Sequence, residues 1–122
     1  MDELVTRLSG AAHIEPAKAV SAVKTILLFL DKEAPSDAVQ ELVQAIPGAD
    51  AALSEAKAEQ DEDAGFAGFG AMAAYHALTA VGLSGSEVQI VTKELLAHAR
   101  EKVGEETTGR IVGAIPGLEA FI

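Results

Sequence analysis

Glu94, His98 and Glu101 are the residues whose types and spacing come closest to a metal site. Residues three and four positions apart share one face of a helix, so these three side chains would lie together. Di-metal sites in helical bundles use glutamate and histidine at such spacing, but they need matching ligands from paired helices. The first half of the chain offers none 69 residues earlier, where it has Thr25, Phe29 and Lys32. We therefore expect no metal site and interpret Glu94 and His98 as a surface pair that stabilises its helix.

The acidic run of residues 61–63 has the oxygen ligands that a hard cation such as calcium prefers. An EF-hand loop needs oxygen ligands at positions 1, 3 and 5, glycine at position 6 and glutamate at position 12. Counted from Asp61, the last three of these positions hold Gly65, Phe66 and Met72, so the pattern fails. We interpret the run as a solvated stretch of charge.

No other motif predicts catalysis. No serine stands in a Gly-x-Ser-x-Gly elbow, and the glycines of residues 65–70 lack the lysine and the preceding strand of a phosphate-binding loop. His13 and His76 have no partner nearby in the sequence, so we expect them on helix ends or faces. The prediction is a non-enzymatic protein with no catalytic residues, no metal and no cofactor. An enzyme would need a metal on Glu94 and His98 or a chemistry without a visible motif.

The charge balance excludes one large class of partner. The chain has 122 residues, with 19 acidic and 9 basic side chains and a formal net charge of −10. Nucleic acids and anionic membranes are bound through clustered cations, and here the basic residues are dispersed. No apolar run reaches the roughly 18–20 residues of a membrane span, and the start Met1-Asp2-Glu3 is acidic where a signal peptide is basic. We expect a cytoplasmic protein, and the absence of cysteine excludes disulfides and thiolate chemistry.

Helical spacing of apolar residues runs through the first half, and no segment alternates as a strand does. Three helices are expected, over about 2–12, 16–33 and 36–46. Proline fits the first position of a helix, where its missing N–H costs nothing, so Pro16 begins the second helix. Pro47 ends the third, because the residue before proline leaves the α region. The second helix is apolar almost all round and is predicted to be the buried centre of its half.

The second half repeats this order with different punctuation. Its first helix is expected to end near Val81, with Gly82 following it. Ser84 and Glu87 form the Ser-x-x-Glu pattern of a capping box, which opens a long helix. Gly104 breaks that helix, and a short helix continues toward Ala114. With a further helix from about Asp50, the chain is predicted to be all-α, a six- to seven-helix bundle.

An internal repeat links the two halves. Residues 46–48, Ile-Pro-Gly, recur as residues 115–117, and the same offset of 69 aligns further identical pairs such as Lys24 with Lys93 and Leu27 with Leu96. We interpret this as a tandem duplication of a three-helix unit. The chain is then one domain, 1–122, made of repeat unit one at 1–53, an acidic Gly/Phe connector at 54–70 and repeat unit two at 71–122.

The connector places bulky apolar groups on a glycine-rich backbone, with Phe66 and Phe69 standing between three glycines. The two rings either pack between the halves or form a contact surface for a partner or a second copy, since aromatic residues are enriched at interfaces. If they form a contact surface, Phe66, Phe69 and Tyr75 are the residues expected to carry it.

The stretches 13–27 and 42–48, with 81–96 and 111–117 in the second half, resemble a group of small bacterial helical proteins of unknown function, the VcgC/VcgE-like family. The resemblance spans most of the chain outside the connector. It implies an all-α bacterial protein and brings no activity or site residues with it.

Two functions from different classes follow. The first is a protein–protein interaction or scaffold module that self-associates, with a homo-oligomer or an unknown protein as its partner. The alternative is a carrier of a small apolar ligand or lipid, with a slot between the two repeat units. A bound small molecule would distinguish the carrier from the interaction module.

Overall fold

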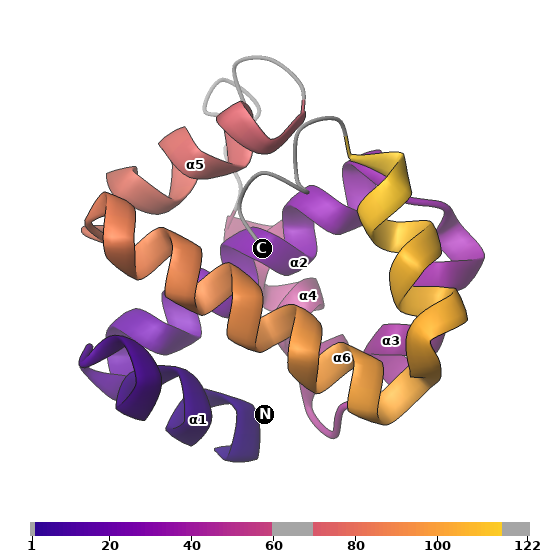
Figure 1. Cartoon of the computed structure of the whole chain (residues 1–122), viewed down its shortest axis with the longest axis horizontal. Coiled ribbons are helices and arrows are strands. Elements are labelled where there is room, and N and C mark those ends of the chain that lie inside the picture. Colours follow the sequence, from indigo (N-terminus) through magenta and orange to yellow (C-terminus); the bar gives the residue numbers. More distant parts are fainter. Residues whose placement is uncertain (1, 60–69, 116–122) are drawn as a thin grey trace.

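The computed structural model describes residues 2–59 and 70–115, and all the regular elements in them are helices (Figure 1). This confirms the predicted all-α class. No helix in these residues combines the length and the apolar character needed to cross a membrane. The six helices are α1 (Asp2–Ala12), α2 (Pro16–Glu33), α3 (Ser36–Ala45), α4 (Ala49–Glu59), α5 (Gly70–Ala80) and α6 (Gly85–Ala114).

Helix α2 is the centre of the bundle, as the sequence predicts. It packs against all five other described helices. Its buried residues surround most of its circumference and are Ala19, Ala22, Val23, Ile26, Leu27, Phe29 and Leu30. A helix that is apolar on nearly all sides is stable in water only when other elements cover it, which explains why the bundle forms around this segment.

Helix ends follow the predicted punctuation. Pro16 occupies the start of α2, and Gly82 follows α5 with φ of 104°. At the start of α6, the Glu87 backbone N–H donates to Ser84 Oγ (3.2 Å), and the Ser84 N–H donates to Glu87 Oε1 (2.9 Å). This is the complete capping box, and a cap of this kind contributes about 1 kcal/mol to stability.

Gly104 divides α6 into two segments. Its backbone has φ of 88° and ψ of 168°, outside the helical region, while the residues on both sides are helical. Figure 1 shows the chain turning sharply there, so that the last part of α6 runs back past α3. The predicted break at Gly104 is confirmed, and it lets one continuous segment cover α1 with one part and α3 with the other.

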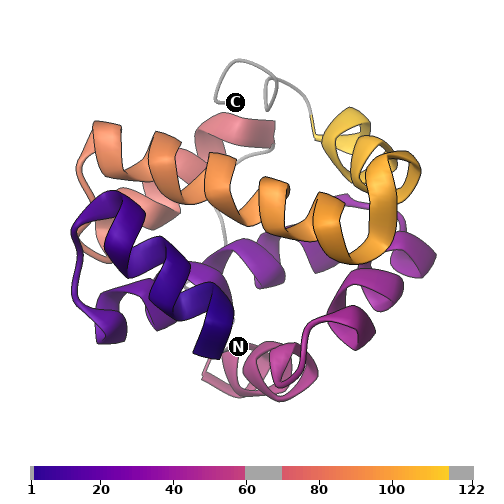
Figure 2. The same ribbon diagram turned by 60° about the horizontal axis from the view of Figure 1, so that its bottom comes forward.

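Helix α1 lies beside the first part of α6 although the two are more than 80 residues apart in the chain (Figures 1 and 2). Leu4 and Leu8 of α1 are buried in the same core as Leu95 and Leu96 of α6. The first helix of the chain is therefore packed on the second half, and this packing brings the N-terminal turn of α1 next to α6.

Helix limits and burial recur at a fixed spacing of 69 residues. Helices α2 and α6 begin at Pro16 and Gly85, and α3 and α6 end at Ala45 and Ala114. Each of these ends is followed by an isoleucine in extended conformation, with φ and ψ of −105° and 110° after α3 and −111° and 106° after α6. Every buried residue from 83 to 115 also lies 69 positions after a buried residue.

Candidate functional site

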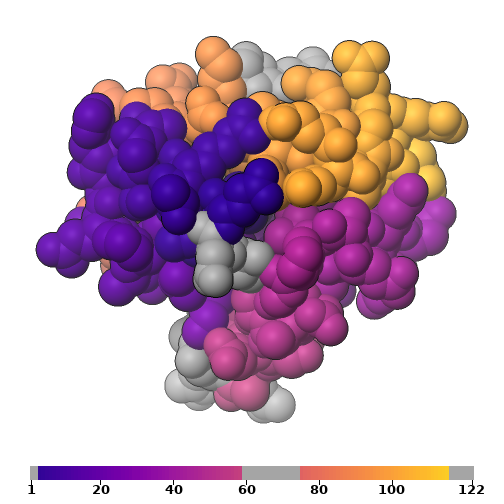
Figure 3. Space-filling model, turned by 90° about the horizontal axis from the view of Figure 1, so that it is seen from below, coloured from indigo at the N-terminus to yellow at the C-terminus, as the bar shows by residue number. Residues whose placement is uncertain are grey.

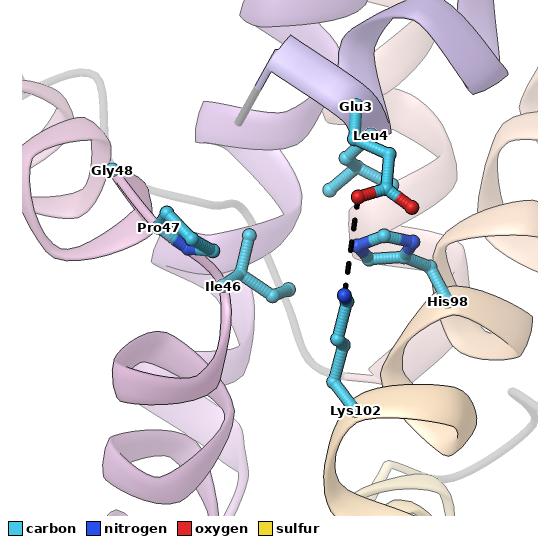
Figure 4. A pocket seen from close by; sticks show the side chains of 7 residues that line it. All are labelled: Glu3, Leu4, Ile46, Pro47, Gly48, His98 and Lys102. Carbon is cyan, nitrogen blue, oxygen red and sulfur yellow. Dashed lines mark ion pairs between the residues drawn. The ribbon is translucent and has the colours of Figure 1, made fainter.

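A pocket of about 360 Å³ opens where three segments meet. The N-terminal turn of α1 forms one wall, the turn between α3 and α4 the second, and the middle of α6 the third. Figure 3 shows these parts of the chain, indigo, magenta and orange, beside one another on one face of the molecule. The pocket is lined by Glu3, Leu4, Ile46, Pro47, Gly48, His98 and Lys102 (Figure 4).

His98 is the central polar group of this pocket and is only 2% exposed. Burial lowers the pKa of its imidazole below the ordinary value of 6.5; the nearby positive charges of Lys102 and Arg7 lower it further, and Glu3 and Glu101 act in the opposite direction. The imidazole is therefore neutral at pH 7. A neutral imidazole offers one N–H donor and one acceptor nitrogen, so it can bind either kind of partner.

Two opposite charges face each other beside His98. Lys102 Nζ and Glu3 Oε2 are 3.9 Å apart, which is longer than a hydrogen bond. The Glu3 side chain is 77% exposed and that of Lys102 34% exposed, so both heads are reachable from solvent. In Figure 4 the carboxylate and the ammonium lie on either side of the imidazole. Each keeps its hydrogen-bonding capacity for a third group.

The other lining residues are apolar. Leu4 and Ile46 are buried at the base of the pocket, and Pro47 is exposed at its edge. Pro47 places this wall because it cannot continue the helix and holds the chain in a turn before α4 begins at Ala49. The pocket thus joins an apolar base to a rim with one positive and one negative charge.

The structure corrects the interpretation of Glu94 and His98 as a surface pair. Glu94 turns to Arg7, whose Nε donates to Glu94 Oε2 at 2.8 Å, and Arg7 Nη1 donates to Glu101 Oε2 at 2.5 Å. His98 points instead into the pocket, where it is buried. The physical reason is the packing of α1 on α6, which brings a cation to the two carboxylates and covers the imidazole. These hydrogen bonds hold the pKa of Glu101 below and that of Arg7 above their ordinary values.

Metal binding is not favoured at this place. Within the part of the chain that the structure describes, no three histidine, aspartate or glutamate side chains come close enough to hold an ion. His13 lies in the turn after α1, in left-handed conformation with φ of 56°, and His76 is exposed on α5.

The three candidate interface residues are placed differently. Phe66 and Phe69 lie outside the described residues, as does the acidic run 61–63. Tyr75, on α5, is half-buried against the core, and its ring meets that of His76 edge-on at 6.1 Å between centroids. Its hydroxyl lies close to Gly85 at the start of α6, where an added Cβ would be 2.9 Å away. Tyr75 therefore contributes to packing between α5 and α6.

All buried polar side chains of the described residues belong to the second half. They take the places that apolar residues hold 69 positions earlier: Thr92, His98, Thr107 and Thr108 correspond to Val23, Phe29, Ala38 and Val39. Thr107 is partnered, since its hydroxyl donates to Glu41 Oε2 at 2.9 Å. The signal for a buried His98 was thus present in the sequence, because its counterpart is a phenylalanine in the central helix.

Thr108→Val is expected to raise the free energy of unfolding by about 1 kcal/mol. Thr108 is 1% exposed and its Oγ1 has no hydrogen-bond partner in the described residues, so valine removes an uncompensated polar group at nearly constant volume. Urea denaturation measures the change. Thr107→Val is the matched control and should give no such gain, because it breaks the bond to Glu41. A loss of stability in Thr108→Val would show that the hydroxyl has a partner after all.

The depressed pKa of His98 predicts a loss of stability in mild acid. The unfolded chain binds a proton at His98 more readily than the folded chain, so stability falls as the pH drops below about 6.5 and recovers as it rises. The lowered pKa values of Asp37 and Glu101 act in a separate window, below their ordinary values of 3.8 and 4.5. Melting temperatures between pH 5 and pH 7.5 isolate the His98 effect from these carboxylates.

His98→Phe should remove most of the His98-dependent slope and leave a folded protein, since Phe29 shows that this place in a unit accepts a buried ring. The charged groups that face His98 are Glu3 and Arg7 from α1 and Glu101 and Lys102 from its own helix. His76→Gln, on an exposed position of α5, should keep the slope. An unchanged slope in His98→Phe would refute the assignment.

The chain matches no family model, no curated protein and no solved structure.

Proposed function

We propose that this chain is a non-enzymatic binding module, built by duplication of a three-helix unit, that takes a small molecule in the pocket between its two units. The observation that carries the proposal is the origin of the pocket walls. Glu3, Leu4 and residues 46–48 come from unit one, and His98 and Lys102 come from unit two. This is the position of the slot expected for a carrier, with a charged rim in place of a purely apolar lining.

The recurrence at 69 residues supports the duplication. Helix limits, the extended isoleucine after the last helix of each unit and the pattern of buried residues all follow the same offset. In the α2–α3 part of unit one, Ala34 is the buried residue without a buried counterpart, and Val103 at that place is half-buried. Chance similarity between alanine-rich helices would match composition, but it would not reproduce burial position by position.

Divergence between the units supports a binding role for the second. A duplicated core position is free to change only where the change is tolerated or useful, and a buried histidine in place of Phe29 costs stability in mild acid. The imidazole lies at the pocket wall, where that cost can be offset by contact with a ligand. Small-molecule sites combine such a placed polar group with an apolar lining.

Native mass spectrometry of the untagged protein from its own cells tests this role. The expected result is the chain carrying a small-molecule adduct, with the adduct lost in His98→Phe and kept in His76→Gln. A bare wild-type chain, or an adduct that survives in His98→Phe, would contradict the proposal.

Self-association through the connector is the second candidate. Two phenylalanines among glycines, Phe66 and Phe69, favour it, because aromatic groups are enriched at protein interfaces. Changing both to serine should then weaken association and leave helicity and melting temperature nearly intact. Loss of the fold in this variant would show that the rings belong to the core. A cytoplasmic location and membership of the VcgC/VcgE-like group remain part of this proposal.

A further inference from the structure

The charged rim of the pocket has a geometry that a single ion does not satisfy. Lys102 Nζ and Glu3 Oε2 are close enough to attract each other but, at 3.9 Å, too far apart to share a hydrogen bond. Charge-assisted hydrogen bonds have lengths of about 2.7–2.9 Å, so each head can bind a ligand group of opposite charge without leaving its place. A ligand with an anion and a cation on neighbouring atoms would close an alternating ring of four charges.

The overall charge of the chain argues against a ligand with one charge. A net charge of −10 opposes the approach of an anion, and an anion on Lys102 would also face the Glu3 carboxylate. A cation on Glu3 would face the Lys102 ammonium. A zwitterion carries no net charge, so the field of the protein does not repel it, and it satisfies both heads together.

The base of the pocket specifies what the ligand carries besides its charges. Leu4 and Ile46 are buried at the base, and Pro47 adds an apolar edge (Figure 4). A volume of about 360 Å³ is at the lower end of the range for small-molecule sites. His98 lies between the charged heads and can donate to a carboxylate or accept from an ammonium.

We infer that the pocket binds a small zwitterion of the α-amino-acid class with an apolar side chain, with the ligand carboxylate on Lys102, its ammonium on Glu3 and its side chain over Leu4 and Ile46. This inference rests on the proposed function, since it names the class of ligand that the same pocket takes.

Titration calorimetry with three matched probes tests the ligand class. The probes are L-leucine, 4-methylpentanoate, which lacks the ammonium, and 3-methylbutylamine, which lacks the carboxylate. Leucine is expected to bind about ten-fold or more tightly than either analogue, since each analogue loses one charge-assisted hydrogen bond. Equal or tighter binding of the carboxylate would make the ligand an anion, equal or tighter binding of the amine would make it a cation, and either result overturns the inference.

Charge-removing variants test the assigned contacts. Lys102→Met and Glu3→Gln should each weaken leucine binding about ten-fold or more. In Lys102→Met, leucine should lose its advantage over 3-methylbutylamine, and in Glu3→Gln it should lose its advantage over 4-methylpentanoate. Lys57→Met is the matched control, because Lys57 pairs with Asp31 at 3.1 Å between α4 and α2, and it should bind leucine as the wild type does. Equal weakening in all three variants would refute the contacts.

The two levels of the proposal fail in different ways. If none of the three probes binds but the protein from its own cells carries an adduct that His98→Phe loses, the pocket is a site and the amino-acid class is wrong. If no probe binds and no adduct is present, both the class and the pocket function are wrong.

Discussion

Leu27→Ala is expected to lower the free energy of unfolding by about 3–5 kcal/mol, the upper part of the range for leucine-to-alanine changes in cores. Leu27 is fully buried, and its helix α2 packs against every other described helix. The neighbours are held by several helices at once and cannot collapse into the space that the side chain leaves. Because domains of this size are stable by about 5–15 kcal/mol, urea denaturation should show a large shift of the midpoint.

Leu28→Ala is the matched control for this prediction. Leu28 is the next residue on the same helix, has the same chemistry and is only half-buried, so its loss should cost well under half as much. Leu96→Ala, at the position 69 residues after Leu27, should again be costly because Leu96 is buried in the same core. Similar losses for Leu27→Ala and Leu28→Ala would contradict the central position of α2.

Gly104→Ala is expected to cost about 1–3 kcal/mol, although an added Cβ would meet nothing within 4 Å. With φ of 88° and ψ of 168°, Gly104 occupies a backbone region that is essentially restricted to glycine. The cost is therefore strain in the backbone and not a clash with a neighbour. Thermal and urea denaturation measure it.

Gly109→Ala serves as the control because it makes the same chemical change five residues later. Gly109 is exposed in the helical part of α6, and a Cβ there also meets nothing within 4 Å. Alanine loses less conformational entropy than glycine in a helix, so this variant should gain about 0.5–1 kcal/mol. A gain in both variants would mean that residue 104 is helical and that α6 is straight.

The helices and their ends could be predicted from the sequence because the signals are local. Pro16 fits the first position of a helix, Ser84 and Glu87 cap each other, and Gly82 and Gly104 allow positive φ where the chain turns. Each signal acts within one or two helical turns. The all-α class and the order of the helices follow from such signals alone.

The candidate site could not be predicted, because its walls come from segments far apart in the chain. Arg7 reaches Glu94 and Glu101 only because α1 packs on α6, and no local pattern in the sequence indicates that packing. The same contact brings Glu3 to Lys102 and closes one side of the pocket. Long-range packing of this kind is decided by the fit of whole apolar faces.

His98 shows how a repeat could have corrected a local interpretation. Its spacing from Glu94 indicated a helix surface, whereas its counterpart Phe29 indicated the core, and the core interpretation is right. Phe29 was taken as evidence against a second metal ligand, but not as evidence for burial. Position-by-position comparison of the two units would have identified His98 as a buried polar residue.

The central claim is that the pocket beside His98 receives a small molecule. Only three histidines are present, and His13 and His76 are exposed, so NMR of histidine-labelled protein can follow the His98 ring once His98→Phe has assigned its signal. Adding the small-molecule fraction of the protein's own cells is predicted to shift the His98 ring signals and leave those of His13 and His76 in place. Unmoved His98 signals, or equal shifts in all three rings, would contradict a binding site at this pocket.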